Sequence, residues 1–202
     1  MTTVTGYIPD TVTDVNMLFN SNLLLTTIPL DIFKCAYRLT NANYVFGGCN
    51  LTVNIDSESF FGPAGKPVSK NVGENTYDTQ YISDIPEQYV DKSGLIPKVK
   101  PSITSMVSAL ASNKNLSFDV SSVNIFKNHT TLANAAAVFA GCTNVYGDCT
   151  NIFKYNTSLT NIESCFNATK VYLTGDLFDG QYNGQISIGS IFGNHIDDGN
   201  LR

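Results

Sequence analysis

Two segments of this chain read almost alike and lie 27 residues apart. Residues 122–139 are SVNIFKNHTTLANAAAVF, and residues 149–166 are CTNIFKYNTSLTNIESCF. The same step of 27 residues separates four pairs of phenylalanines, namely Phe19 and Phe46, Phe33 and Phe60, Phe126 and Phe153, and Phe139 and Phe166. A fixed period in this range is typical of chains built from stacked supersecondary units, so the period constrains the fold more than any other feature.

Apolar residues at the spacing i, i+3 and i+7 recur in five places, which puts three side chains on one face of a short helix. In three of these places an asparagine (Asn41, Asn134 or Asn161) stands where its side chain can cap the helix N-terminus. The five triplets are Val12, Val15, Phe19; Leu39, Ala42, Phe46; Ile103, Met106, Leu110; Leu132, Ala135, Phe139; and Leu159, Ile162, Phe166. The sequence therefore predicts five short helices.

A short extended stretch and an aromatic hinge follow each predicted helix, as in Ile125-Phe126-Lys127 and Ile152-Phe153-Lys154. One short helix and one short strand per period are typical of a leucine-rich-repeat solenoid. We therefore predict an α/β repeat solenoid, leucine-rich-repeat-like, of about five turns of ~27 residues with one long inserted loop. Its predicted repeat core consists of Phe19, Phe33, Phe46, Phe60, Phe126, Phe139, Phe153, Phe166 and Phe178.

The period is interrupted once, because the unit expected near Lys66 begins only at Ile103. The predicted organisation is N-terminal repeats at 1–61, an inserted loop at 62–101, C-terminal repeats at 102–180 and a C-terminal closing segment at 181–202. The loop holds the tyrosines Tyr77, Tyr81 and Tyr89 among several prolines. Insertions in repeat proteins often lie on the binding face, so these three tyrosines are the predicted binding residues. The alternative is that they pack on their own scaffold.

Three stretches carry a resemblance to a known family: LTNANYVFGGC (39–49), LANAAAVFAGC (132–142) and NIFKYNTSLTNIESCF (151–166). They resemble BspA-type leucine-rich repeats, which occur in bacterial surface proteins and in structural proteins of tailed phages. The resemblance implies a non-catalytic binding or assembly module. The chain departs from the family pattern at Leu110-Ala111-Ser112, where F-x-G-C is expected, and in the shorter step of 25 residues from Phe153 to Phe178.

Composition argues against several classes of partner. The net charge of −5 and the pI near 4.8 offer no basic stripe, so neither nucleic acid nor an anionic membrane is an expected partner. No run of 18 apolar residues is present, so we expect no membrane insertion. The N-terminus has neither a basic start nor an apolar region, so a secretory signal is not expected in the chain as given.

Residues that could carry chemistry are few and scattered. The five cysteines (Cys35, Cys49, Cys142, Cys149 and Cys165) lack C-x-x-C spacing and are expected to be free buried thiols, with no metal bound. A disulfide would require the fold to bring two of them within reach. His129 and His195 are expected on the surface or in turns, and Asp197 and Asp198 beside His195 are expected to be solvated. No nucleotide-binding or nucleophile motif occurs, so we expect no enzyme activity and no cofactor.

These observations lead to three functional hypotheses. The first is a non-enzymatic component of a tailed-phage virion that contacts other virion or surface proteins, or a glycan or protein of the host surface, within a larger assembly. The second is a fragment of a leucine-rich-repeat adhesin located on the bacterial cell surface. The third and remote one is a carbohydrate-active enzyme built on a solenoid, which predicts clustered carboxylates along one face. The partial repeat at the start of the chain, Gly6-Tyr7-Ile8-Pro9, suggests docking on another subunit or a boundary within a longer protein.

Overall fold

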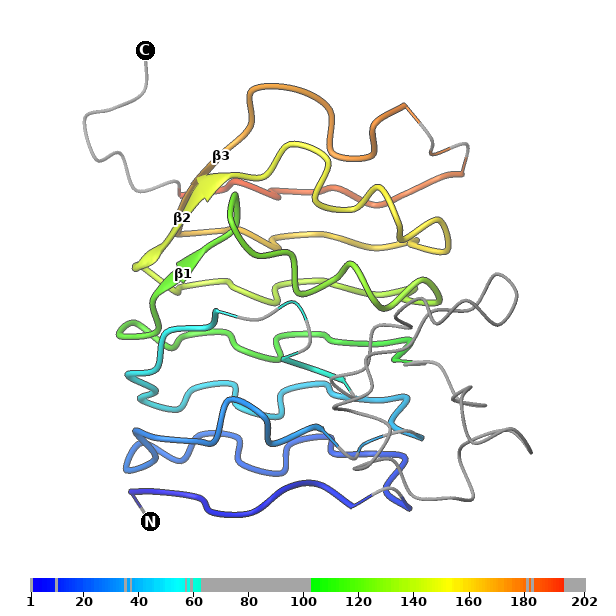
Figure 1. Ribbon diagram of the computed structural model, residues 1–202. Coiled ribbons are helices and arrows are strands. Elements are labelled where there is room, and N and C mark those ends of the chain that lie inside the picture. Colours follow the sequence, from blue (N-terminus) through cyan, green and yellow to red (C-terminus); the bar gives the residue numbers. More distant parts are fainter. Residues whose placement is uncertain are drawn as a thin grey trace, which may run out of the picture.

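The regular secondary structure is a small parallel sheet of three strands (Figure 1). Strand β1 is Phe118–Asp119, β2 is Val145–Asp148 and β3 is Lys170–Tyr172, and they lie side by side in the order β1-β2-β3. The computed structural model describes residues 2–9, 11–34, 36, 38–56, 58, 60–62, 103–180, 182 and 184–194. Among these residues there is no helix.

Isolated parallel bridges extend the stacking of the sheet along the whole described chain. One row of bridges joins Asp14, Asn41, Ser105, Asn134, Asn161 and Ser187, each to the next. We call this the bridge row, and the eight-residue pieces that begin at its members are the bridge-row segments 14–21, 41–48, 105–112, 134–141, 161–168 and 187–194. Figure 1 shows these segments one above another, with the N-terminal segment at one end of the stack and the C-terminal segment at the other.

Each bridge-row segment is built from two consecutive tight turns. In the first segment, the backbone N–H of Leu18 donates to the Val15 carbonyl (3.1 Å), and the N–H of Asn22 donates to the Phe19 carbonyl (3.2 Å). The third residue of each turn has a positive φ, 58° at both Met17 and Ser21, which is the pattern of type II turns. The same two positions have positive φ in every segment, at Tyr44 and Gly48, Ser108 and Ser112, Ala137 and Gly141, Ser164 and Ala168, and Ser190 and Asn194.

This geometry overturns the predicted fold class, the leucine-rich-repeat-like α/β solenoid. In the part of the chain that the structure describes, none of the five predicted helices exists and the only strands are β1, β2 and β3. Two turns of four residues in series bury side chains at spacings of three and four residues, which is also the spacing of a helix face. The asparagines predicted as helix caps instead accept a hydrogen bond from the backbone N–H two residues on, at 3.0 Å for Asn41, 3.0 Å for Asn134 and 2.9 Å for Asn161.

The core is a column of aromatic and aliphatic side chains inside the stack. Of the nine predicted core phenylalanines, Phe33, Phe46, Phe60, Phe126, Phe139, Phe153 and Phe166 are buried, and Phe19 and Phe178 are partly buried. The rings of Phe139 and Phe166 stack with their centroids 5.9 Å apart and their planes 11° apart. Such pairs contribute about 0.5–1.5 kcal/mol beyond the area they bury. Leu110 takes the phenylalanine position in the 105–112 segment and is fully buried.

The two bridge-row segments on either side of the predicted inserted loop lie next to each other, because Asn41 bridges directly to Ser105. Asn54 bridges to Ser117 in the same way on another side of the stack. Apart from Gly62, the loop predicted at 62–101 falls outside the described residues, and so do Tyr77, Tyr81 and Tyr89. Most of the predicted closing segment lies within the description, up to Asn194.

Candidate interaction surfaces

The four described cysteines are buried and unpaired, and their environment suppresses their chemistry. Burial raises the pKa of the Cys142 thiol to about 12. Burial, and then the charge of Asp148, raises the pKa of Cys149 to about 12 as well. Because the thiolate is the reactive and metal-binding form, these thiols are poor nucleophiles and poor ligands at neutral pH. Within the described residues, no three His, Cys, Asp or Glu side chains gather closely enough to hold a metal ion. Cys35 lies outside the description.

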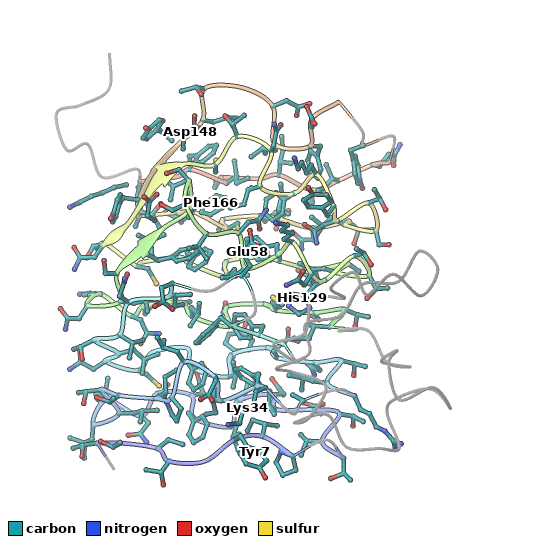
Figure 2. The ribbon with its side chains drawn as sticks, in the orientation of Figure 1. Tyr7, Lys34, Glu58, His129, Asp148 and Phe166 are labelled. Carbon is teal, nitrogen blue, oxygen red and sulfur yellow. The ribbon has the colours of Figure 1, made fainter. Side chains whose placement is uncertain are left out.

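His129 is fully buried, so its predicted surface or turn location is wrong as regards exposure. Neither imidazole nitrogen has a hydrogen-bond partner, and burial lowers the pKa of the side chain to about 3. One period later, Asn156 is also buried, and its side-chain Nδ2 donates to the carbonyls of Phe126 and His129, both at 2.8 Å. His129 is therefore a neutral packing residue, located inside the middle of the stack (Figure 2). His195, Asp197 and Asp198 lie outside the described residues.

The N-terminal end of the stack exposes a group of large apolar side chains. Met17, Leu18, Leu23 and Leu24 are all exposed, with Leu23 at 72% and Leu24 at 63% of full exposure. We call these four residues the N-terminal apolar patch. The ammonium group of Lys34 lies 5.5 Å from the ring centroid of the exposed Tyr7, also at the N-terminal end of the stack (Figure 2). Large apolar side chains exposed close together in the chain are a sign of an interaction site.

Other layers of the stack have polar residues where the patch has leucines. Leu23 and Leu24 form the corner before the buried Leu25. The corresponding corners before the buried Leu116 and Val145 are polar, namely Lys114-Asn115 and Thr143-Asn144. Lys114, Asn115 and Asn144 are exposed, and Thr143 is partly exposed. The stack does not require apolar corners, so the two leucines serve something other than the internal packing.

A second exposed surface lies on the small parallel sheet. Tyr146 of β2 and Tyr172 of β3 are both exposed. The strand register places Tyr146 opposite Lys170 and Asp148 opposite Tyr172, so both tyrosines have a charged neighbour across the pair of strands. The carboxylate of Asp148, labelled in Figure 2, accepts hydrogen bonds from the backbone N–H of Thr150 at 3.0 Å and from the Thr150 hydroxyl at 2.7 Å. These contacts fix its orientation beside the aromatic rings.

No known protein family, curated protein or solved structure matches this chain. The resemblance to BspA-type repeats accordingly stays a prediction from the sequence. Within the described residues, no helix is long and apolar enough to cross a membrane.

Neither surface was singled out from the sequence, which pointed to Tyr77, Tyr81 and Tyr89 instead. One signal for the N-terminal patch was nevertheless present. The apolar pair Leu23-Leu24 precedes Leu25, whereas the polar pairs Lys114-Asn115 and Thr143-Asn144 precede Leu116 and Val145. For the exposed tyrosines of the sheet the sequence held only the alternation Val145-Tyr146-Gly147, which is too short to identify a strand.

Proposed function

We propose that this chain is a non-enzymatic structural module that joins neighbouring subunits of a larger assembly, and that this assembly is a tailed-phage virion. The observation that supports the proposal is the N-terminal apolar patch of Met17, Leu18, Leu23 and Leu24. The link to a virion comes from the sequence resemblance to repeats found in phage structural proteins.

The composition around the patch suits the centre of a protein–protein interface. From Val15 to Leu25 the chain has no charged residue, and charged residues are depleted at the cores of interfaces. Fully burying a Leu or Met side chain contributes about 1.5–3 kcal/mol, so covering four half-exposed ones contributes roughly 1 kcal/mol each. A partner that covers the patch therefore gains a few kcal/mol from these side chains alone, which is a useful part of a subunit contact.

The test is incorporation into particles. In the phage or bacterium that encodes the chain, mass spectrometry would quantify its peptides in purified particles and, separately, in the host cell envelope. We expect the wild-type chain at stoichiometric copy number in particles. The double variant Leu23→Lys, Leu24→Asn, which copies the polar corner Lys114-Asn115, should be incorporated about tenfold less, since about 1.4 kcal/mol of lost contact is a tenfold change.

The matched control is Tyr155→Ser, which removes another exposed large side chain away from the patch. Its incorporation should equal that of the wild type. Absence of the wild-type chain from particles would overturn the proposal, and equal incorporation of the double variant would show that the patch is not the contact.

The sheet surface favours a second candidate, a cell-surface adhesin. Exposed tyrosines beside a carboxylate and an ammonium group can stack on a sugar ring and hydrogen-bond its hydroxyls, or contact a protein. This candidate predicts recovery of the chain in the envelope fraction. It also predicts that glycan-array binding is lost in the double variant Tyr146→Ser, Tyr172→Ser and retained in Tyr155→Ser.

A further inference from the structure

We propose that copies of this chain bind head to tail, with the C-terminal end of one stack placed on the N-terminal end of the next, so that the bridge row continues from copy to copy. The inference rests on the proposed assembly function and names the partner of the N-terminal end as a second copy of the same chain.

The argument begins with the hydrogen bonds inside the stack. Between any two adjacent bridge-row segments, four backbone N–H groups of the earlier segment donate to four carbonyls of the later one. At the N-terminal pair the bonds are Val15 to Asn41 (3.0 Å), Met17 to Asn43 (2.9 Å), Phe19 to Val45 (3.0 Å) and Ser21 to Gly47 (2.7 Å). At the C-terminal pair they are Ile162 to Ser187, Ser164 to Gly189, Phe166 to Ile191 and Ala168 to Gly193, all at 2.9 Å. These four bonds point the same way along the stack at every junction. The bonds that run the other way beside the bridge row all go to one carbonyl per junction, as when the N–H groups of Thr40 and Asn41 donate to the Thr13 carbonyl (2.9 and 3.3 Å).

Because the four regular bonds of each junction share one direction, they leave complementary groups at the two ends of the stack. At the N-terminal end, four carbonyls accept no hydrogen bond from the described residues, those of Asp14, Asn16, Leu18 and Asn20. At the C-terminal end, four N–H groups donate to none of the described residues, those of Ile188, Ser190, Phe192 and Asn194. The two sets have the same number and the same spacing along the chain as each bonded pair inside the stack. Unpaired edges of this kind act as templates for pairing with another chain.

The side chains at the two ends show the same incompleteness. Leu18 is 50% exposed, whereas its counterparts Val45, Ala109, Val138 and Cys165 are fully buried. At the other end Ile188 is 54% exposed, whereas its counterparts Ala42, Met106, Ala135 and Ile162 are fully buried. Each end thus presents, at a position that is fully buried in the four middle segments, an apolar side chain that one further layer would cover.

The aromatic column also ends on both faces. The ring of Phe192 stacks on Phe166 with the planes 14° apart, and the ring of Phe19 stacks on Phe46 with the planes 1° apart. Both terminal rings are only partly buried. Each end has little charge, because Asp14 is the one charged residue of the 14–21 segment and residues 186–194 contain none, despite the net charge of −5.

The polarity of the ladder selects the geometry of association. The four regular donors lie at one end and the four regular acceptors at the other, so neither end can form these four bonds with a copy of itself. The contact is therefore heterologous, and a heterologous contact that does not close into a ring grows as a filament.

The test is sedimentation velocity of the full chain from about 1 µM to about 200 µM, a range that covers weak to moderate association. We expect the wild type to sediment faster as its concentration rises. Leu18→Asp disables the N-terminal end, Ile188→Asp disables the C-terminal end, and each variant alone should stay monomeric. An equimolar mixture of the two should form a dimer and nothing longer, because each variant retains the end that the other lacks. Tyr155→Asp, which adds the same charge elsewhere on the surface, should associate like the wild type.

Circular dichroism and thermal melting of each variant establish that it folds, and Leu18→Ser and Ile188→Ser replace any aspartate variant that does not. A monomer across the whole range would overturn the inference, as would association that survives both end substitutions or a mixture that fails to dimerise. If the chain is monomeric but is incorporated into particles, the assembly function stands and the partner of the N-terminal end is a different protein. If the chain forms filaments but is absent from particles, the head-to-tail contact stands and the proposed virion function is wrong.

Discussion

Ala136 and Ala137 are neighbours in the 134–141 segment whose backbones differ in a way that a glycine substitution can measure. Ala137 has a φ of 55°, in the left-handed region, whereas Ala136 is not among the residues with positive φ. An L-residue in the left-handed conformation costs about 1–2 kcal/mol, and glycine avoids that cost. Glycine also loses more conformational entropy on folding, about 0.5–1 kcal/mol relative to alanine. Ala136→Gly should therefore destabilise the fold by about 0.5–1 kcal/mol, whereas Ala137→Gly should be neutral or stabilising by up to about 1 kcal/mol.

The assay is urea unfolding monitored by circular dichroism. The two variants must show the same dependence of the free energy of unfolding on urea concentration for their stabilities to be compared. The decisive quantity is the difference in the free energy of unfolding between the two variants. We expect about 1–2 kcal/mol, or about 2–8 °C in melting temperature for a chain of this size. Gly141→Ala is a companion variant. Its φ is 76° and an added Cβ would lie 3.5 Å from the Ser112 Cα, an ordinary contact, so its loss of stability should come from the backbone conformation alone.

In a helix both alanines would have the same conformation and both glycine variants would cost about 1 kcal/mol. Equal losses for Ala136→Gly and Ala137→Gly would therefore refute the two-turn structure of the segment and restore the helix predicted from the apolar spacing.

Two further predictions concern the core. Burial lowers the pKa of His129 to about 3 in the folded chain, from near 6.5 in the unfolded chain. Between these two pH values the unfolded chain binds one more proton than the folded chain. The free energy of unfolding therefore falls as the pH falls, by up to about 1.4 kcal/mol per pH unit. Urea midpoints at several pH values should show this slope reduced in His129→Asn, which copies Asn156, and an unchanged slope would show that His129 does not cause it. Phe139→Ala should cost about 3–5 kcal/mol, as for other large-to-small core changes, and Phe192→Ala clearly less because Phe192 is only partly buried. Equal losses in thermal or urea unfolding would contradict the position of Phe192 at the end of the column.

The sequence predicted which side chains lie inside better than it predicted the backbone that places them there. Ala42, Ala135 and Ile162 are fully buried, as the apolar triplets required. Apolar residues spaced three and four apart indicate only that their side chains lie on the same side of the segment. Two type II turns in series place side chains on one side in this way, as a helix does.

Local propensity even favoured the wrong answer at Asn134-Ala135-Ala136-Ala137, since alanine is the best helix former. What decides against a helix is a set of contacts with other segments. Met106 donates its backbone N–H to the Asn134 carbonyl at 2.9 Å, and Ala135 and Ala137 donate theirs to Asn161 and Glu163 at 2.9 and 2.8 Å. A window of ten residues cannot contain this information. The glycines at positions 48 and 141, both with positive φ, were the local signs of turns.

The surfaces were harder to predict than the core for a related reason. Whether Leu18 is exposed depends on whether a layer lies beyond it, and its sequence position is equivalent to that of the fully buried Val45. Exposure at the end of a stack is a property of how many layers there are, which no single unit of the sequence encodes. The burial of His129 was missed for a different reason, because its polar neighbours Asn128 and Thr130 suggest a surface turn.

The composition of the two ends bears on whether they face water. Edges that remain in solvent usually have charged side chains, particularly lysine, or proline, which prevent pairing with other chains. Residues 15–25 and 186–194 have neither charge nor proline. Charge is available elsewhere in the same stack, for example in the pair of Lys127 and Glu58, whose Nζ and Oε2 atoms are 2.9 Å apart near the middle of the molecule. Asp14 is the one charged residue of the 14–21 segment, and neither this segment nor 187–194 contains lysine or proline, whereas the corner at Lys114-Asn115 has a lysine. This contrast is why substitutions that add charge at Leu18 and Ile188 are the sharpest test of how the molecule assembles.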